Sequence, residues 1–264
     1  MKAAILGMGA MGQVHKEVYE SLGIETLTYD VRDGPNWIPT VREADIVSIC
    51  SPDNFHAEQI IAAFKMGKHV FCEKPLCHTR KEFEAIKAAY NKECALGMNF
   101  PLRWHLPFVE AKEKLGSLGN VHHFHARYNY GRRHKIDDGW RGDIPYSIVM
   151  GGGIHLIDVL LWMGFDLTPE HSCRTVQDPW QTVSLLAMQR GFGILTCDFV
   201  SPLPHCRTLA LYGEKDSLTI EDTKPTDKGR ALQEFLYHLR SRDPVTDVPT
   251  PEEIFRVHEI GLSL

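Results

Sequence analysis

The sequence lacks several features that would point to other classes of protein. No apolar run approaches the roughly 18 residues that a membrane-spanning helix needs. Acidic residues outnumber basic ones, 34 against 29, and the resulting formal net charge of −5 argues against a general nucleic-acid-binding protein. There is no internal repeat and no low-complexity segment. The 264 residues, 43% of them hydrophobic and 24% charged, have the composition of a globular protein.

The cysteines do not form a disulfide or zinc framework. Their number, seven, is odd, and their spacing is scattered. We therefore expect reduced thiols and a reducing compartment. The apolar run at the N-terminus is too short and too interrupted by glycine for a signal peptide, so a cytoplasmic location is expected.

The first hundred residues alternate between short apolar runs and longer helical patterns. This alternation predicts parallel strands that are covered by helices on both faces, a doubly wound α/β sheet. The expected strands are Ala3–Leu6, Glu25–Tyr29, Ile46–Cys50, His69–Cys72 and Cys94–Met98. The expected helices are Ala10–Leu22, Asn54–Met66 and Thr79–Tyr90.

The pattern changes after about residue 118. Alternation with period two predicts a mostly antiparallel sheet from strands within 120–131, 182–201 and 207–222. An apolar helix is expected over 151–164, and two further helices over 229–241 and 251–264. The prediction is a dinucleotide-binding domain over 1–118 and an α+β domain for substrate binding and oligomerisation over 119–264, with a cleft between them.

The segment ILGMGAMG supplies a glycine motif, Gly7-x-Gly9-x-x-Gly12, between the first expected strand and helix. In that setting the glycines allow a tight turn, close approach of a pyrophosphate and close packing of helix on strand. Asp30 follows at the spacing of an acid that binds a ribose 2′-hydroxyl, which favours NAD over NADP. Arg32 beside it could instead stack on adenine or pair with a phosphate. The alternative is a purely structural turn.

Two other strand ends carry polar residues at the same expected edge of the sheet. Ser51 and Pro52 follow the third strand, and His56 comes shortly after. The fourth strand ends in CEKP, so Pro75 restrains the direction of Lys74. Ligands of open parallel sheets bind at this edge. We therefore expect Lys74 to accept a proton from a substrate hydroxyl; a surface lysine at the start of a loop is the alternative.

A second glycine cluster, GGGIHLID, precedes the apolar helix. We expect its glycines to let the backbone pass close to cofactor and substrate. His155 would lie in the first helical turn, where the positive helix end favours a neutral imidazole. Asp158, three residues on, shares its face and could orient His155, bind a substrate hydroxyl or act as an acid. The alternative is a buried histidine–aspartate pair.

The long polar segment 129–143 is expected to be a loop. Arg132 and Arg133 within it could bind an anionic substrate, although a solvated charge run is the favoured interpretation. His123 and His125 share one face of a strand, and a pair without a third ligand is a poor metal site. We therefore predict no metal.

Six segments, GMGAMG, SPDNFH, CEKPL, MNFPLRW, GWRGD and GGGIHLID, occur in an order that resembles one family over nearly the whole chain. They are similar to the glucose–fructose oxidoreductase / inositol dehydrogenase (Gfo/Idh/MocA) family of NAD(P)-dependent oxidoreductases. The resemblance implies a Rossmann domain, a second sheet whose outer face often forms the oligomer interface, and catalytic roles for Lys74 and His155. It places Trp140 and Arg141 near the cofactor. Many members carry an aspartate where this chain has Gly151, so their lysine–aspartate–histidine trio is incomplete here.

These observations predict a dehydrogenase that moves a hydride between nicotinamide and a CH–OH carbon of a sugar, polyol or nucleotide sugar. Two alternatives stay open: NAD-dependent glycosidic cleavage without net redox change, and a non-catalytic NAD-binding sensor or partner subunit. The chain is expected to form a homo-oligomer through its C-terminal sheet. The residues expected to bind the cofactor are Gly7, Met8, Gly9, Ala10, Met11, Gly12, Asp30, Arg32, Ser51, Pro52, His56, Glu73, Lys74, Trp140 and Arg141. Those expected at the substrate are Lys74, Arg132, Arg133, His155 and Asp158, with Lys74, His155 and Asp158 catalytic.

Overall fold

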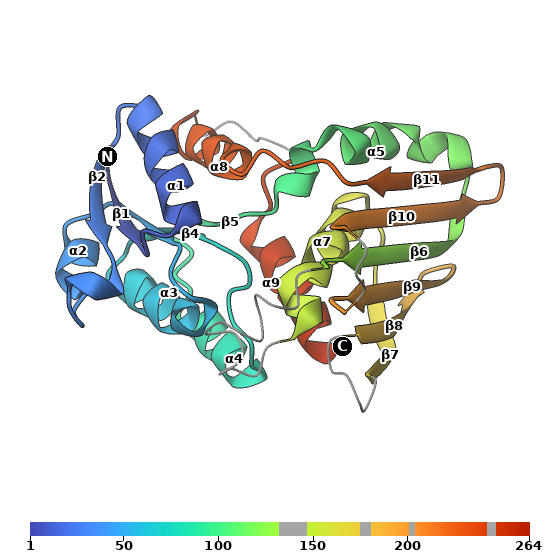
Figure 1. The fold of residues 1–264 in the computed structure, drawn as a ribbon, viewed down its shortest axis with the longest axis horizontal. Coiled ribbons are helices and arrows are strands. Elements are labelled where there is room, and N and C mark those ends of the chain that lie inside the picture. Colours follow the sequence, from blue (N-terminus) through green and yellow to red (C-terminus); the bar gives the residue numbers. More distant parts are fainter. Residues whose placement is uncertain (132–146, 175–180, 201–203, 242–246) are drawn as a thin grey trace. The chain divides into compact units, whose positions relative to one another are not determined.

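The computed structural model describes residues 1–131, 147–174, 181–200, 204–241 and 247–264, and the chain divides into two compact units (Figure 1). Unit 1 combines Met1–Pro101 with Asp227–Phe255, and unit 2 combines Leu102–Thr226 with Arg256–Leu264. A late segment of the chain thus returns to the first unit. The division into domains at residue 118 stays a prediction.

Unit 1 is built on a parallel sheet, as the apolar runs predict. Its strands are β1 (Lys2–Leu6), β2 (Glu25–Tyr29), β3 (Ile46–Ile49), β4 (His69–Cys72) and β5 (Leu96–Met98). Their order is β2-β1-β3-β4-β5, and every neighbouring pair is parallel. The strand that follows β1 in sequence, β2, pairs with one edge of β1, and the next strand, β3, pairs with its other edge. The strand order therefore reverses between β1 and β3, and open parallel sheets bind ligands at the carboxyl ends of such a pair.

Helices cover both faces of this sheet. In Figure 1, α1 (Ala10–Ser21) and α8 (Arg230–Ser241) lie on one face, while α3 (His56–Lys65) and α4 (Arg80–Ala89) lie on the other. A Cβ on Gly97 would stand 2.5 Å from the ring of Phe235, so this glycine permits the close approach of α8 to β5. The shorter elements are α2 (Ile38–Arg42), η1 (Val31–Asp33) and η2 (Asp53–Phe55).

Unit 2 contains a six-stranded sheet in the order β11-β10-β6-β9-β8-β7. Its strands are β6 (Val121–Asn129), β7 (Thr168–Arg174), β8 (Gln181–Met188), β9 (Gly191–Asp198), β10 (Cys206–Gly213) and β11 (Ser217–Asp222). Only β6 and β9 pair in parallel among these neighbours, so the prediction of a mostly antiparallel sheet is confirmed.

The remaining elements complete the course of the chain. They are η3 (Pro101–Trp104), α5 (Leu106–Leu118), η5 (Val149–Gly153), α7 (Ile154–Trp162) and α9 (Pro251–Ser263). The sequence patterns did not predict α5. Within unit 2 the ammonium of Lys112 on α5 lies 3.9 Å from the ring centre of Trp162 on α7, which ties these two helices together. No helix in the described part of the chain is long and apolar enough to cross a membrane.

Candidate active site

The glycine loop between β1 and α1 contains glycines of two kinds. Gly7 has a φ of +93°, and a Cβ on it would stand 2.5 Å from the backbone nitrogen of Ser51. A Cβ on Gly12 would collide with the carbonyl oxygen of Gly7. The fold itself therefore requires both. Gly9 differs, because its φ of −74° suits any residue and a Cβ on it would meet nothing within 4 Å. No structural demand explains a glycine there.

The amino end of α1 opens beside Gly9. Gly9 is the N-cap, has no side chain and leaves the first turn without a side-chain cap. The first amide groups of an α-helix have no partner within the helix. Ala10 and Met11 occupy this first turn, and Gly9 and Ala10 are exposed. The arrangement suits a bound anion, since helix N-termini favour negative charge.

Asp30 stands at the carboxyl end of β2, next to this loop. Its Oδ2 accepts a hydrogen bond from the backbone N–H of Met8 at 3.0 Å, and its Oδ1 accepts one from Nε of Arg32 at 2.8 Å. The hydrogen bond from Arg32, followed by that from Met8, lowers the pKa of Asp30 to about 2. Asp30 is therefore a carboxylate at neutral pH, as the sequence-based choice of NAD requires.

The end of β3 is held by a buried histidine. Nδ1 of His56 lies 2.6 Å from the carbonyl oxygen of Pro75, and Nε2 lies 2.9 Å from that of Ser51. The side chain of Ser51 donates to Gln59 at 2.6 Å, and Pro52 is half-buried. His56 has no exposed surface, so its ring contacts the protein interior.

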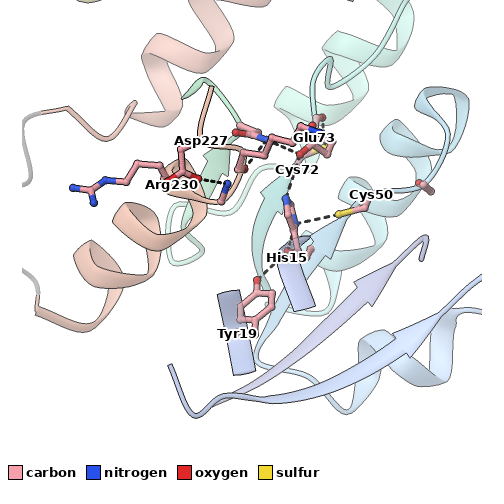
Figure 2. Close-up of polar contacts among 12 residues, drawn as sticks. His15, Tyr19, Cys50, Cys72, Glu73, Asp227 and Arg230 are labelled. Atoms are coloured by element: carbon pink, nitrogen blue, oxygen red, sulfur yellow. Dashed lines mark hydrogen bonds and ion pairs between the residues drawn. The ribbon is translucent and has the colours of Figure 1, made fainter. Parts of the chain in front are cut away.

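Glu73 and Lys74 follow β4 directly, and the Lys74–Pro75 peptide bond is cis. Oε1 of Glu73 accepts hydrogen bonds from Nε2 of His15 at 3.2 Å and from Nδ2 of Asn99 at 2.7 Å (Figure 2). Burial by itself would raise the pKa of Glu73, but the hydrogen bonds from His15 and Asn99 and the charges of His15 and Lys74 outweigh it and lower the pKa. The Glu73 carboxylate is thus turned toward His15 and Asn99.

The other side of His15 continues this network into the sheet. Nδ1 of His15 lies 3.0 Å from Oγ of Ser48 and 3.1 Å from Sγ of Cys50, and the Tyr19 hydroxyl is 3.0 Å from Ser48 (Figure 2). Serine, histidine and glutamate are also the residue types of a hydrolase triad. Ser48 has no exposed surface, so its hydroxyl cannot attack a substrate. Burial raises the pKa of the Cys50 thiol well above its ordinary value, so this thiol stays neutral.

His155 lies in the first turn of α7 in unit 2, as expected, but this turn is not an open helix end. A π-helical turn, η5, runs directly into α7, with Gly153 in helical conformation at the junction. His155 therefore does not stand at an open helix end, and the argument that a positive helix terminus keeps it neutral does not apply. Its half-buried ring stacks on Tyr128, with ring centres 6.3 Å apart.

The glycines before His155 serve packing inside unit 2. A Cβ on Gly152 would collide with the ring of Tyr128, and one on Gly153 would stand 2.5 Å from Sγ of Cys197. Tyr128 and Cys197 belong to β6 and β9, so these glycines let the π-helical turn approach the sheet. This contact gives the glycine cluster a structural reason that the sequence analysis did not identify.

Asp158 is fully buried and paired. Its two carboxylate oxygens each lie 3.1 Å from Nε of Arg103, and its Oδ1 lies 2.7 Å from Nη2. Neither side chain has exposed surface. The alternative of a buried structural aspartate therefore has a definite partner, Arg103.

Several predicted residues fall outside the described part of the chain. These are Arg132, Arg133, Trp140 and Arg141. Of the two strand histidines, His123 stacks on Tyr212 with ring centres 5.4 Å apart, and burial lowers the pKa of His125. Among the described residues, no group of three or more histidine, cysteine, aspartate or glutamate side chains could hold a metal ion.

The sequence analysis missed His15 and Asn99. Both are buried, and both contact Glu73. His15 follows Gly12 by one helical turn, on the side of α1 that packs against the sheet, and that spacing is the signal that could have identified it. For Asn99, the only signal in the sequence is its position directly after β5.

Comparison with known proteins agrees with this arrangement. Residues 15–100 match the sequence model of an oxidoreductase family with an NAD-binding Rossmann fold. Myo-inositol 2-dehydrogenase from Thermotoga maritima is 28% identical over 148 residues, 46% of this chain and 43% of the relative. D-glucoside 3-dehydrogenase from Escherichia coli is 31% identical over 145 residues, 51% of this chain and 40% of the relative. The aligned part is thus less than half the length of either relative.

The whole fold also has counterparts among solved structures. That of myo-inositol 2-dehydrogenase from Lactobacillus plantarum aligns with a TM-score of 0.80 over 99% of this chain and 95% of the other, at 18% identity. At this identity the likeness concerns the fold alone. Together, the glycine loop, the acid after β2, the lysine after β4 and the match over residues 15–100 make the chain similar to the oxidoreductase family with an NAD-binding Rossmann fold.

Proposed function

We propose that this protein is an NAD-dependent dehydrogenase or reductase that acts on a CH–OH group of a sugar, polyol or nucleotide sugar. The family match and the inositol and glucoside dehydrogenases among its relatives support this reaction class. Nicotinamide, when bound, supplies the hydride acceptor or donor. The protein's own residues must bind the cofactor, orient the substrate and move the hydroxyl proton.

The observation that carries the proposal is Gly9. Its backbone conformation needs no glycine, and no neighbour occupies the space of its missing side chain. The amino end of α1 opens there without a side-chain cap. A glycine that the fold does not need, at an open helix N-terminus, fits the close approach of a pyrophosphate. The residues present therefore suit a dinucleotide.

Asp30 and Arg32 suit NAD better than NADP. The Asp30 carboxylate is charged at neutral pH and stands beside Met8 of the glycine loop. A carboxylate at this position repels a 2′-phosphate and accepts a hydrogen bond from a 2′-hydroxyl. Arg32, the residue that could have favoured a phosphate, is paired with Asp30 at 2.8 Å.

Lys74 and His155 are the residues that we propose for proton transfer. Lys74 extends from the carboxyl end of β4, where parallel sheets bind their ligands. His155 offers an imidazole, the commonest general acid and base in enzymes. We propose a supporting role for Asp158, because its carboxylate is held by Arg103. In this role the Asp158 carboxylate holds α7 in place through Arg103 and does not accept a proton from the substrate.

Cofactor binding and turnover test this function separately. Binding of NAD and NADP to the purified protein is measured by calorimetry. Reduced-nicotinamide absorbance is then followed with inositols, glucosides and nucleotide sugars. We expect micromolar NAD binding, weaker NADP binding and turnover of at least one polyhydroxylated substrate that Lys74→Ala abolishes. Absence of both binding and turnover across the panel would overturn the proposal.

The same panel decides between the two alternatives. Release of free sugar from a glycoside without accumulation of reduced cofactor would indicate glycosidic cleavage through a transient oxidation. NAD binding without any turnover, together with full biological activity of Lys74→Ala, would indicate a sensor or partner subunit. Within the described ranges of the chain, no feature favours either alternative over the dehydrogenase.

We also propose that the protein is a cytoplasmic homo-oligomer that associates through the open face of the sheet in unit 2. Large apolar side chains are exposed on this face, including Leu185 at 38%, Phe192 at 51% and Tyr212 at 40%. Strand pairing places Phe192, His123 and Tyr212 in one row. A second copy would cover this surface. Light scattering should give a dimer or larger for the wild type and a monomer for Phe192→Glu. The seven cysteines form no disulfide, which fits a reducing compartment.

A further inference from the structure

Lys74 lies between two residues that each form a hydrogen bond with a buried histidine. Glu73, on one side, accepts a hydrogen bond from His15 at 3.2 Å. Pro75, on the other side, presents its carbonyl oxygen to His56 at 2.6 Å. His15 lies in the second turn of α1, His56 is the first residue of α3, and neither has exposed surface. The segment 73–75 is thus anchored on both sides of its lysine.

We propose that His15 and His56 are positioning residues for Lys74, the first through the Glu73 carboxylate and the second through the Pro75 carbonyl. The proposal rests on the catalytic role proposed for Lys74. It assigns each histidine a different task, because His15 acts through a carboxylate side chain and His56 through a backbone carbonyl.

The His15 anchor sets charge as well as position. The lowered pKa of Glu73 means that it carries a negative charge one residue from Lys74. A carboxylate acceptor requires Nε2 of His15 to be the donor. The thiols of Cys50 and Cys72 also interact with the charge of Glu73, and burial raises their pKa values well above the ordinary range. Both thiols therefore stay neutral, and Glu73 contributes the negative charge of this network.

The other donor to Glu73 is neutral and connects a distant segment. Nδ2 of Asn99 contacts Oε1 of Glu73 at 2.7 Å and the carbonyl oxygen of Lys228 at 3.4 Å. Asp227, next to Lys228, caps α8 by accepting from the backbone N–H groups of Gly229 at 2.9 Å and Arg230 at 3.2 Å (Figure 2). The carboxylate is thus fixed by α1, by the end of β5 and, through Asn99, by the start of α8.

The His56 anchor acts on the backbone of the segment 73–75. Pro75 has no backbone N–H, so its carbonyl is the one polar backbone group that can fix its orientation. The opposite nitrogen of the same ring lies 2.9 Å from the Ser51 carbonyl. One imidazole therefore joins the segment after β4 to the end of β3.

Asparagine and glutamine variants separate the two nitrogens of each ring. The amide of asparagine reaches about as far as Nδ1, and that of glutamine reaches about as far as Nε2. His15→Asn therefore loses the contact with Glu73, while His15→Gln keeps it. The assignment reverses at the second site, where His56→Gln loses the contact with Pro75 and His56→Asn keeps it. Each damaging variant has a matched partner with a similar loss of packing.

The experiment measures Lys74 itself in the cofactor-free protein. Trace acetylation with acetic anhydride, followed by peptide mass spectrometry, gives the reactivity of each lysine amine against pH. Exposed Lys81 on α4 serves as the internal reference. Only the neutral amine reacts, and a nearby negative charge favours the ammonium form. Glu73→Gln should therefore speed Lys74 acetylation roughly fivefold at about pH 8, and move its profile toward lower pH.

The histidine variants should give distinct signatures. His15→Asn removes a donor from Glu73, leaves its charge less compensated and should slow Lys74 acetylation roughly threefold. His56→Gln loses the contact with the Pro75 carbonyl and should change the rate of Lys74 acetylation relative to His56→Asn, which keeps it. His15→Gln and His56→Asn should resemble the wild type. A wild-type profile for Glu73→Gln, or equal behaviour within each histidine pair, would overturn the proposal.

Acetylation needs neither cofactor nor substrate, so it separates this inference from the proposed function. The expected labelling pattern without NAD binding or turnover would leave the positioning network standing and remove the dehydrogenase. Turnover that Lys74→Ala abolishes, combined with Lys74 acetylation that no histidine variant changes, would support the dehydrogenase and overturn the positioning network. His69→Asn, at the opposite end of β4, controls for the general loss of a histidine. Thermal unfolding of each variant checks that it is folded before it is labelled.

Discussion

Arg103 and Asp158 form an ion pair in which neither side chain has exposed surface, with Nη2 and Oδ1 2.7 Å apart. The guanidinium approaches both carboxylate oxygens, so each charge is compensated by direct hydrogen bonds. Arg103 lies on η3 and Asp158 on α7, and the pair joins these two elements inside unit 2. Because of this contact, we propose that Asp158 holds α7 in place and takes no direct part in proton transfer.

Breaking this pair should destabilise the protein strongly. Asp158→Asn leaves the Arg103 charge buried without its counter-charge, and we expect a loss of about 3–5 kcal/mol in the free energy of unfolding. The double variant Arg103→Met, Asp158→Leu removes both charges and should recover much of this loss. Urea unfolding measures both. An Asp158→Asn protein with wild-type stability and no turnover would instead restore a catalytic role for Asp158.

Two glycines of one loop should respond to alanine in opposite ways. Gly9→Ala should keep the wild-type melting temperature, because nothing lies within 4 Å of the added Cβ, yet weaken NAD binding about tenfold, or about 1.4 kcal/mol. Gly12→Ala should destabilise the fold itself, since its Cβ collides with the Gly7 carbonyl. Calorimetry of binding and of unfolding checks the two. Unchanged NAD affinity in a folded Gly9→Ala protein would remove the observation on which the proposed function rests.

Replacing Asp30 should shift the choice of cofactor. In Asp30→Ala the repulsion of a 2′-phosphate is lost, and Arg32 is released from its 2.8 Å contact with the carboxylate. We expect the ratio of the Kd values for NADP and NAD to fall about tenfold. Adding Arg32→Ala should reverse part of that change, because the guanidinium is then absent. Identical ratios in all three proteins would show that Asp30 does not contact the ribose.

Asp30 also predicts a pH dependence of stability. Its pKa in the folded protein is about 2, below the ordinary 3.8, so its ionised form favours folding. This contribution is fully present above about pH 5, and it is lost as the pH falls toward about 2. The difference in unfolding free energy between wild type and Asp30→Asn should therefore shrink between those values. A difference that stays constant down to about pH 2 would contradict the hydrogen bonds from Met8 and Arg32.

The glycine cluster before His155 offers a test of packing. Gly152→Ala pushes a Cβ into the ring of Tyr128 and should cost about 1–3 kcal/mol of stability. Gly116→Ala on α5 is the matched control, because its Cβ meets nothing within 4 Å. A glycine inside a helix is unfavourable relative to alanine, so this control should gain up to about 1 kcal/mol. Chemical denaturation of both proteins measures the free energy of unfolding. A Gly152→Ala protein as stable as the wild type would contradict the packing role and favour the earlier interpretation, in which these glycines let a ligand approach the backbone.

The sequence by itself determined the parallel sheet, the glycine loop and the acid after β2. These features are local, because a buried strand, a tight turn and a strand-to-loop junction each leave a pattern within a few residues. The ranges of β2 and β4 match their predictions, Glu25–Tyr29 and His69–Cys72, for this reason. The role expected for Gly9 likewise follows from the glycine motif of which it is part.

Only the tertiary structure decided which side chains meet. His15 and Glu73 are 58 residues apart in the chain, and Arg103 and Asp158 are 55 apart. Such pairs depend on how whole helices and strands pack, which no short window of sequence contains. The π-helical turn before His155 was missed for a related reason, since it arises where Gly152 and Gly153 let the chain pack against Tyr128 and Cys197. Local patterns therefore located Lys74, and long-range packing supplied the two histidines that hold its neighbours.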